Sequence, residues 1–555
     1  MWHMHQPEYR DLRTDEYQLP WTYLHGIKDY VDMAAHLENN ENARAVVNFA
    51  PVLLDQLQDY DKQISDFLHH STPIRDTLLS VLAEPVLPVV KEERSKLLRD
   101  CLRANQKRVI DFFKPYKRLA SIARLALKQA DLLHYLEDQF VLDLLVWHHL
   151  GWTGASVREN NETIKRLIIK ESNYTLSDRH ALMEVIGELI HSIIPRYREL
   201  AMQGRVELAM SPYAHPILPL LLDIKSTCEA MPDARLPVLE NYPGGKERSH
   251  WHLDQGIKTF QRHFGITPIG CWPSEGSVSE DTMTLLNDAG FKWAASGANV
   301  LHNSINKSEL ADTACIHQAY RVNDNPLTCF FRDDGLSDQI GFNYSDWHAD
   351  DAVANLIHHL ENIANACQEK PDSIVSIILD GENAWEYYPE NGHYFLEALY
   401  HQISAHPGLT LTTYKEYLSK QPEPLQLSSL VAGSWVYGTF STWIGDTDKN
   451  RAWDMLGDAK HAFDKAVLQG KIQGERLIKA EHQLAICEGS DWFWWFGDYN
   501  PEDTVSDFEH LFRLNLSILY SIIGDSPPDY LSQSFTHGSG APAMGGTMRP
   551  GQETK

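Results

Sequence analysis

Residues 270–279 read GCWPSEGSVS, and residues 377–388 read IILDGENAWEYY. In both stretches a short apolar run ends and a carboxylate follows, Glu275 in the first and Asp380 in the second. This pattern is typical of a buried β-strand that carries an acidic side chain at its carboxyl end. The ends of parallel strands meet at one rim of a barrel, so we expect the two carboxylates to face each other. A single acidic residue in such a place is more often an N-cap or an ion-pair partner.

Similar β-type runs, separated by helical patterns, are spread over the chain up to Asp380. They are Arg44–Phe49, Arg205–Met210, Pro268–Trp272, Phe291–Ala295, Thr328–Arg332 and Ser373–Leu379. Strands that alternate with helices predict an α/β fold with a parallel sheet, and this many repeats predict a barrel. A further strand should precede His3, but only Met1 and Trp2 are there. We therefore expect either a very short first strand or a chain truncated at its start.

The sequence pattern divides the chain into three parts. Residues 1–410 are predicted to form the barrel, with a mostly helical insertion at about 60–200 between the second and third strands. Over residues 411–531 apolar residues recur at helical spacing, which predicts a helical bundle beside the mouth of the barrel that completes the active site. Residues 532–555 are rich in Gly, Ser, Pro and Thr and are expected to be disordered.

Composition and charge limit the kinds of partner. The chain has 555 residues, 43% of them hydrophobic, which is enough for a large core. Lys plus Arg number 49 and Asp plus Glu 76, so the formal net charge is −27. Such a surface repels phosphate groups, which disfavours nucleic acids and anionic membranes as partners. The most apolar helical stretch, Phe140–Leu150, is too short to span a membrane.

The cysteines and the N-terminus bear on the compartment. The seven cysteines are scattered and form no CxxC pair. Their spacing predicts neither a disulfide framework nor a cysteine-zinc site, and we expect no metal and no cofactor. The N-terminus lacks the basic and apolar regions of a signal peptide. These features favour a cytoplasmic protein in a reducing compartment.

The two carboxylates and the aromatic residues beside them suit glycoside chemistry. Cleavage of a glycosidic bond needs two carboxyl groups, one to attack the anomeric carbon and one to shuttle the proton. Aromatic side chains such as Trp272 and Trp385 suit the apolar faces of sugar rings. His3 and His5 alternate on a predicted strand and so face the same side. Such a pair is a core feature about as often as a binding one.

Five separated stretches together resemble glycoside hydrolase family 57, a family of α-amylase-type enzymes. They are residues 3–7 (HMHQP), 204–208 (GRVEL) with 211–216 (SPYAHP), 270–279, 377–388 and 491–495 (DWFWW). The resemblance runs from residue 3 to about 520 and implies an incomplete (β/α)7 barrel followed by a helical bundle. It also implies that Glu275 is the nucleophile and Asp380 the general acid/base of a retaining enzyme.

The same stretches contain the candidates for substrate binding. These are His3, His5, Glu207, His215, Trp272, Glu382, Trp385, Asp491 and Trp494. By resemblance, the histidines and Glu207 should hydrogen-bond sugar hydroxyls, and Trp272 and Trp494 should stack on sugar rings. Structural roles compete with binding, because the tryptophans of residues 492–495 would also suit a bundle core. Trp435 is expected mainly to pack the fold, and Arg332 to orient a carboxylate or form a plain salt bridge.

We expect a retaining hydrolase of α-1,4 glucans such as starch, glycogen or maltooligosaccharides. Residues 380–386 (DGENAWE) most resemble the α-amylase and amylopullulanase branch of the family. Cleavage of α-1,6 bonds, preferred chain length and oligomeric state stay open. A retaining enzyme needs carboxyl groups roughly 5–5.5 Å apart. The charge of Glu275, itself ionised, should raise the pKa of Asp380.

Other functions would fit parts of the pattern. A 4-α-glucanotransferase or a branching enzyme would use the same scaffold and the same two carboxylates. A metal-dependent polysaccharide deacetylase uses a related barrel and needs a carboxylate and two histidines as metal ligands. A non-catalytic glucan-binding relative would typically have lost one catalytic carboxylate, whereas Glu275 and Asp380 are both present.

Overall fold

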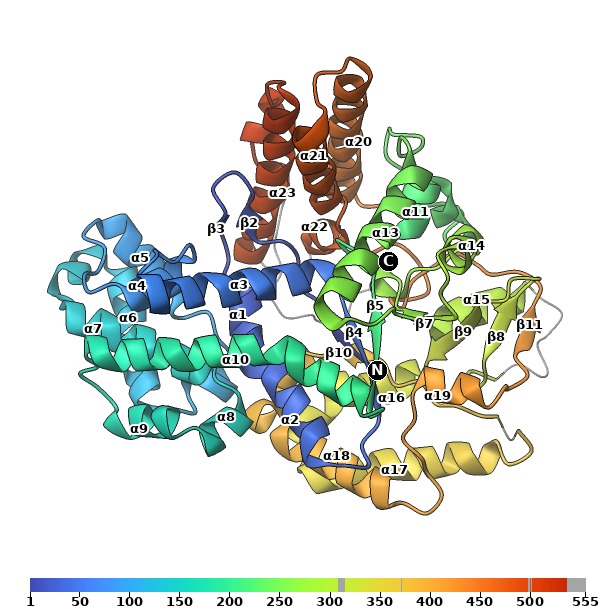
Figure 1. Ribbon diagram of the computed structural model, residues 1–555, viewed down its shortest axis with the longest axis horizontal. Coiled ribbons are helices and arrows are strands. Elements are labelled where there is room, and N and C mark those ends of the chain that lie inside the picture. Colours follow the sequence, from blue (N-terminus) through green and yellow to red (C-terminus); the bar gives the residue numbers. More distant parts are fainter. Residues whose placement is uncertain (308–314, 371, 498–499, 501, 537–555) are drawn as a thin grey trace.

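The computed structural model describes residues 1–307, 315–370, 372–497, 500 and 502–536. Figure 1 shows a central sheet, a group of helices on one side of it and an upright set of helices formed by the last part of the chain. The predicted disordered tail lies outside the described residues from 537 onward, so that expectation is untested there.

A parallel sheet forms the centre of the molecule. Its strands run in the order β10-β1-β4-β5-β6-β7-β9, and each neighbouring pair is parallel. They are β1 (Trp2–Met4), β4 (Ala45–Phe49), β5 (Val206–Met210), β6 (Gly270–Cys271), β7 (Trp293–Gly297), β9 (Thr328–Arg332) and β10 (Leu379–Asp380). An isolated parallel bridge between Arg332 and Ser376 joins the two ends of this row. The predicted α/β fold with an incomplete seven-stranded barrel is confirmed.

Four short strands were not predicted. β8 (Tyr320–Val322) pairs antiparallel with β9, and β11 (Leu425–Leu427) pairs parallel with β8, so both extend the sheet beside the barrel. β2 (Arg10–Asp11) and β3 (Glu16–Tyr17) form a separate antiparallel pair. Each has only two or three residues, which is too few for an alternating pattern to be visible.

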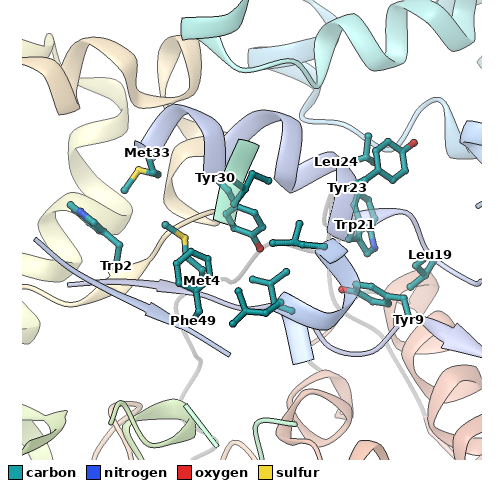
Figure 2. Packing of buried hydrophobic residues seen from close by; sticks show 14 of the residues in the cluster. Trp2, Met4, Tyr9, Leu19, Trp21, Tyr23, Leu24, Tyr30, Met33 and Phe49 are labelled. Carbon is teal, nitrogen blue, oxygen red and sulfur yellow. The ribbon is translucent and has the colours of Figure 1, made fainter. Parts of the chain in front are cut away.

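The first strand is very short, which was one of the two alternatives considered, and its register matters for the site. His3 is paired with Asp380 on one side and with Asn48 on the other. Trp2 and Met4 flank His3 in β1, and Figure 2 shows these two side chains packed with Tyr30 and Met33 outside the sheet. Because successive side chains of a strand point to opposite faces, His3 points into the barrel.

Helices surround the barrel on its outer side. Between β4 and β5 the chain forms α3 (Pro51–His70), α4 (Thr77–Ala83), α5 (Lys91–Asp100), α6 (Lys114–Lys128), α7 (Asp138–Gly151), α8 (Ala155–Asn160), α9 (Glu162–Lys170) and α10 (Leu176–Met202). These are the blue and teal helices of Figure 1, and α10 lies along α3. α1 (Trp21–His25) and α2 (Val31–Asn39) precede β4.

The remaining barrel helices follow the later strands. They are α11 (Leu218–Leu222), α12 (Thr227–Ala230), α13 (Gly245–Phe264), α14 (Glu280–Asp288), α15 (Ala298–Asn306), α16 (Asp334–Asp338), α17 (Ala349–Ala366), α18 (His393–Ala405) and α19 (Tyr414–Ser419). None of the helices in the described part of the chain is long and apolar enough to cross a membrane.

A bundle of helices stands over the strand ends and is fastened to the barrel by a buried ion pair. Its members are α20 (Thr447–Leu468), α21 (Gly474–Cys487), α22 (Ser490–Trp495) and α23 (Glu502–Ile523). Glu488 follows α21 and accepts hydrogen bonds from Arg248 and Tyr242 and pairs with His252. The positive charge of Arg248 and these hydrogen bonds outweigh the effect of burial and lower the pKa of Glu488 to about 2. α22 is thereby held above the barrel.

Candidate active site

Glu275 sits at the carboxyl end of β6 in a tight turn. Its backbone has φ 58° and ψ 26°, and Gly276 also has a positive φ of 58°. A side chain rarely adopts this left-handed conformation, so the turn is strained at Glu275 and is maintained by its surroundings. The Trp435 amide donates to the Glu275 carbonyl at 3.1 Å, and a Cβ on Gly276 would lie 2.7 Å from the Trp272 ring. This turn aims the Glu275 carboxylate across the barrel mouth.

Two donors hold the Glu275 carboxylate. The indole Nε1 of Trp435 donates to Oε2 at 3.0 Å, and the Ser490 hydroxyl makes a second hydrogen bond. Burial raises the pKa of Glu275 well above its ordinary value, and the charges of Asp380 and Asp491 raise it further. The hydrogen bonds from Trp435 and Ser490 act in the opposite direction. They are therefore the groups that favour the ionised form a nucleophile needs.

Asp380 ends β10 and is the second carboxylate of the site. Asn383 donates to its Oδ2 at 2.8 Å. Burial raises the pKa of Asp380 to about 6, and the Asn383 hydrogen bond and the charges of His5 and Arg332 oppose this rise. The charge of Glu275 was expected to raise the pKa of Asp380, but burial is the cause that raises it. Glu275 was expected to stay ionised, but burial raises the pKa of both carboxyl groups.

Three histidine rings stack beside the carboxylates. The ring centroids of His5 and His215 are 3.9 Å apart, and those of His3 and His215 are 5.0 Å apart. Burial lowers the pKa of His3 to about 3 and that of His215 well below its ordinary value. These two rings are therefore neutral and suit hydrogen bonds to uncharged groups. His215 Nδ1 lies 3.0 Å from the Ser490 hydroxyl, which also bonds Glu275.

α22 contributes the bundle's part of the site. His5 Nε2 lies 2.8 Å from Oδ1 of Asp491, in the first turn of this helix. Ser490 donates its amide to the His215 carbonyl at 2.9 Å, so the start of α22 is anchored on the barrel. Trp494 lies one turn further on and faces the cavities. Residues that are more than 480 positions apart, such as His5 and Asp491, thus share one hydrogen bond.

Glu382 lies beneath this cluster. Its Oε1 accepts from the His5 amide at 3.0 Å and from the Tyr30 hydroxyl at 2.8 Å. Burial, and after it the charge of Asp380, raises the pKa of Glu382 well above its ordinary value. Its Oε2 is buried and has no hydrogen-bond partner among the described residues. This oxygen can carry a proton and donate it to a further group.

Two cavities meet at Asp380. The inner cavity, of about 80 Å³, is lined by His3, His5, Tyr9, Glu275, Asp380, Glu382, Asp491 and Trp494, among others. The outer cavity, of about 350 Å³, is lined by Arg332, Phe342, Asp380, Tyr387, Trp435, Tyr437 and Trp494, among others. Asp380, Asn383 and Trp494 line both cavities, so both carboxylates belong to one hollow under the bundle.

Four of the predicted binding residues line neither cavity of this hollow: Trp272, Trp385, Glu207 and His215, the last of which stacks on His5 at its edge. Trp272 is fully buried in the barrel interior, edge-on to Trp435 at 5.4 Å. Trp385 is 1% exposed and packs between Trp2 and Phe395. Neither ring lines either of the two cavities, so stacking on a sugar finds no support there and stays a prediction.

Glu207 is the third such residue. It lies at the beginning of β5, and both of its oxygens are occupied: the Trp293 indole donates to Oε1 at 2.7 Å, and the Lys415 amide to Oε2 at 2.7 Å. Glu207 lines neither of the two cavities. In this arrangement Glu207 ties β5 to β7 and α19, and its bond to a sugar hydroxyl stays a prediction.

Several functional groups were underrated or missed from the sequence. Trp435 was expected to pack the fold, but its indole bonds Glu275 directly. Arg332 forms the plain salt bridges that were considered, with Asp334 and Asp338, and its charge opposes the rise in the pKa of Asp380. Asn383 and Ser490 were missed. Asn383 stands three residues after Asp380, and this proximity was the available signal.

One group of side chains here has the composition of a metal site. Ligand atoms of His5, His215 and Asp491 lie within 4.8 Å of one another. However, the rings of His5 and His215 are stacked at 23°, so their in-plane lone pairs run side by side and do not converge. His5 Nε2 is already bonded to Asp491, and His215 Nδ1 to Ser490. The geometry fits a hydrogen-bond network better than a set of metal ligands.

Comparisons with known proteins agree with this fold. The sequence profile of glycosyl hydrolase family 57 matches residues 1–428. The chain is similar in structure to a GH57 branching enzyme from Thermococcus kodakaraensis (15% identity, TM-score 0.56, 94% of this chain and 88% of that chain covered). It is also similar to a GH57-type branching enzyme from Pyrococcus horikoshii (15%, 0.55, 99% and 98%) and to the α-amylase AmyC from Thermotoga maritima (13%, 0.55, 94% and 91%).

These matches differ in what they establish. No curated protein sequence matches the chain. At 13–15% identity the solved structures show a shared fold and nothing finer. The family profile, in contrast, extends over 428 of the 555 residues and includes Glu275 and Asp380. The chain belongs to glycosyl hydrolase family 57.

Proposed function

We propose that this protein is a retaining enzyme of α-glucans, with Glu275 as the nucleophile and Asp380 as the general acid/base. Family membership already makes it an enzyme that acts on glycosidic bonds. The observation that carries the finer proposal is that Glu275 and Asp380 line the same inner cavity, each at the end of a barrel strand. Cleavage of a glycosidic bond requires two carboxyl groups beside it, and the retaining route is the one that the family resemblance implies.

The first step forms a covalent intermediate. An oxygen of Glu275 attacks the anomeric carbon, the bond from that carbon to the leaving oxygen breaks, and Asp380 gives its proton to the leaving oxygen. In the second step Asp380 takes a proton from an incoming hydroxyl, whose oxygen displaces Glu275. A pKa of about 6 at Asp380 suits a group that must both give and take a proton near neutral pH.

Unpartnered polar atoms support recognition of sugar hydroxyls. Among the described residues, His3 Nε2, His5 Nδ1, His215 Nε2 and Glu382 Oε2 are buried without a hydrogen-bond partner. A buried polar atom without a partner costs free energy, and a hydroxyl of a bound sugar would remove that cost. Because His3 and His215 are neutral, an uncharged glucan suits them better than an anionic ligand.

Matched variants test the assignment. Glu275→Gln should lower kcat on maltoheptaose by about 10⁴-fold or more. Asp380→Asn should lose most activity on maltoheptaose but much less on α-maltosyl fluoride, whose leaving group needs no proton. Glu386→Gln is the control, because burial raises the pKa of Glu386 to about 8, and it lines neither of the two cavities. Wild-type activity in Glu275→Gln, or a β-anomeric first product, would sink the proposal.

Transfer is a second candidate, and the outer cavity favours it. Phe342, Tyr387, Trp435, Tyr437 and Trp494 line this cavity beside Asp380. In a retaining enzyme the acceptor arrives on the side of the acid/base. Aromatic walls there would stack an acceptor sugar and keep water from the intermediate. A 4-α-glucanotransferase or branching activity therefore competes with the hydrolysis expected from the sequence.

Product analysis separates the two outcomes. Hydrolysis of maltoheptaose releases one new reducing end for each bond broken, whereas transfer leaves the number of reducing ends unchanged while longer and shorter chains appear. Branching would in addition create α-1,6 bonds in amylose. Acetate release from an acetylated polysaccharide, without any change in glucans, would favour the deacetylase instead. We further propose a reducing compartment such as the cytoplasm, which the seven free cysteines support.

A further inference from the structure

Three potential metal ligands from distant parts of the chain meet outside the active site. The Sγ atoms of Cys315 and Cys367 and a ring nitrogen of His317 lie within 4.8 Å of one another. Cys315 Sγ is 3.9 Å from His317 Nδ1. Ligands around a tetrahedral zinc ion are about 3.5–3.8 Å apart, given Zn–S and Zn–N bonds of about 2.3 and 2.0–2.1 Å. Small side-chain rotations would therefore bring all three onto one ion.

His317 is oriented as a metal-binding histidine would be. Its Nε2 lies 2.9 Å from Oδ2 of Asp333, so Nδ1 is the nitrogen that faces Cys315. A carboxylate on the second ring nitrogen fixes the tautomer and makes the first a better ligand. Asp333 is itself held, because its Oδ1 accepts from the Leu336 amide at the start of α16.

The backbone at each ligand is also anchored. The Tyr320 hydroxyl accepts from the Cys315 amide at 2.9 Å and donates to the Cys315 carbonyl at 2.7 Å. The His317 carbonyl accepts from the Ile374 amide at 2.9 Å. Cys367 caps α17 and accepts from the Lys370 amide at 2.7 Å. The cluster is thus built before any ion binds, which lowers the cost of assembling a site.

We infer that Cys315, His317 and Cys367 bind a zinc ion, with water as the fourth ligand, and that this ion fastens the seam of the barrel. Two thiolates and an imidazole in tetrahedral reach select zinc among common divalent ions. Binding would release the two thiol protons and leave the complex uncharged, because two thiolates balance one Zn²⁺. The partly exposed Cys315 leaves a side for the water. The inference does not rest on the proposed function.

The position gives the ion a structural role. β9 and the segment before β10 are joined through the isolated bridge between Arg332 and Ser376 and a bond from the Asp333 amide to the Ser376 carbonyl at 2.8 Å. The proposed ion links the segment before β8 to the end of α17, and the His317–Asp333 bond continues the link to the end of β9. It would therefore strengthen the barrel where β9 is joined to the segment before β10 by a single isolated bridge.

Cobalt and zinc titrations of the full, reduced chain test the site. One equivalent of Co²⁺ should produce thiolate-to-cobalt charge-transfer absorption, and Zn²⁺ should displace it. Cys315→Ser should abolish the band, whereas Cys228→Ser, a cysteine of similar exposure on α12, should keep it. Asp333→Asn preserves a capping side chain and should weaken zinc binding about 10- to 100-fold.

Thermal stability tests the role of the ion. Zinc should raise the Tm of the wild type and of Cys228→Ser, but not that of Cys315→Ser. Absence of the cobalt band in the reduced wild type, or an equal band in Cys315→Ser, would overturn the site. A Cys315–Cys367 disulfide in non-reducing peptide maps, with no cobalt band after reduction, would do the same. Zinc binding without a change in Tm would overturn the structural role.

Discussion

Replacing Trp435 by Phe should slow the enzyme by weakening its nucleophile. The substitution removes the indole N–H that lies 3.0 Å from Oε2 of Glu275. A phenyl ring can still pack against Trp272 and under the Arg332 guanidinium, so the fold should persist. What is lost is a hydrogen bond to the ionised form of a buried carboxyl group.

The size of the effect follows from that bond. A hydrogen bond to a charged group contributes about 1.5–3 kcal/mol, which corresponds to a loss of about 10- to 100-fold in kcat/KM. The direction of the pKa change is also defined, because removing a donor to the carboxylate raises the pKa of Glu275. The limb of the pH profile that reports ionisation of Glu275 should then move to higher pH.

The assay is kcat/KM on maltoheptaose between pH 4 and pH 9, with Trp147→Phe as the matched control. Trp147 is buried in α7 and donates to the Glu171 carbonyl at 2.8 Å, so it loses an equivalent indole bond far from the hollow. The Trp147→Phe substitution should therefore lower the Tm and leave the pH profile of kcat/KM unchanged. A Trp435→Phe enzyme with unchanged kcat/KM and an unchanged profile would refute the reasoning.

Three further predictions concern other parts of the account. Asn383→Leu removes a donor to Asp380 and so raises its pKa; in pH–rate profiles the alkaline limb of kcat/KM, expected near pH 6, should move to higher pH. Trp494→Ala should raise KM for long maltooligosaccharides about 3- to 10-fold with little change for short ones, because a stacking face is lost. Glu488→Gln should destabilise the protein by about 3 kcal/mol at pH 7 in urea unfolding. Since the pKa of Glu488 is lowered to about 2, the wild-type advantage should be full above about pH 4.5 and vanish as the pH falls towards 2.

The barrel could be predicted because its strands are buried on both sides. Mostly apolar runs such as residues 328–332 and 206–210 mark strands of this kind. Five of the seven strands were found within two residues of their bounds, and the run predicted for β10 begins six residues too early. β8 and β11 were missed because three residues at the edge of a sheet show no pattern. Glu275 and Asp380 were found because an acidic side chain after an apolar run stands out.

The differences between the predicted and the observed surroundings of the site residues have a common cause. Trp272, Trp385 and Glu207 lie next to motif residues in the sequence, but neighbouring positions on a strand or turn point to different sides. The sequence does not tell which side faces the hollow. Trp435 comes from the segment that leads into the bundle, and its bond to Glu275 joins residues 160 positions apart. Contacts of this kind depend on tertiary packing, which no local pattern records.

The central claim is that Glu275 becomes covalently glycosylated during turnover. The most direct test is to trap this intermediate with an activated fluoro-α-glucosyl fluoride and to map the labelled peptide by mass spectrometry. We predict one glycosyl group per chain, on the peptide that contains Glu275, and no label in Glu275→Gln. A label on Asp380, Asp491 or any other carboxylate, or an unlabelled enzyme that still turns over glucan with a β-anomeric product, would contradict the account.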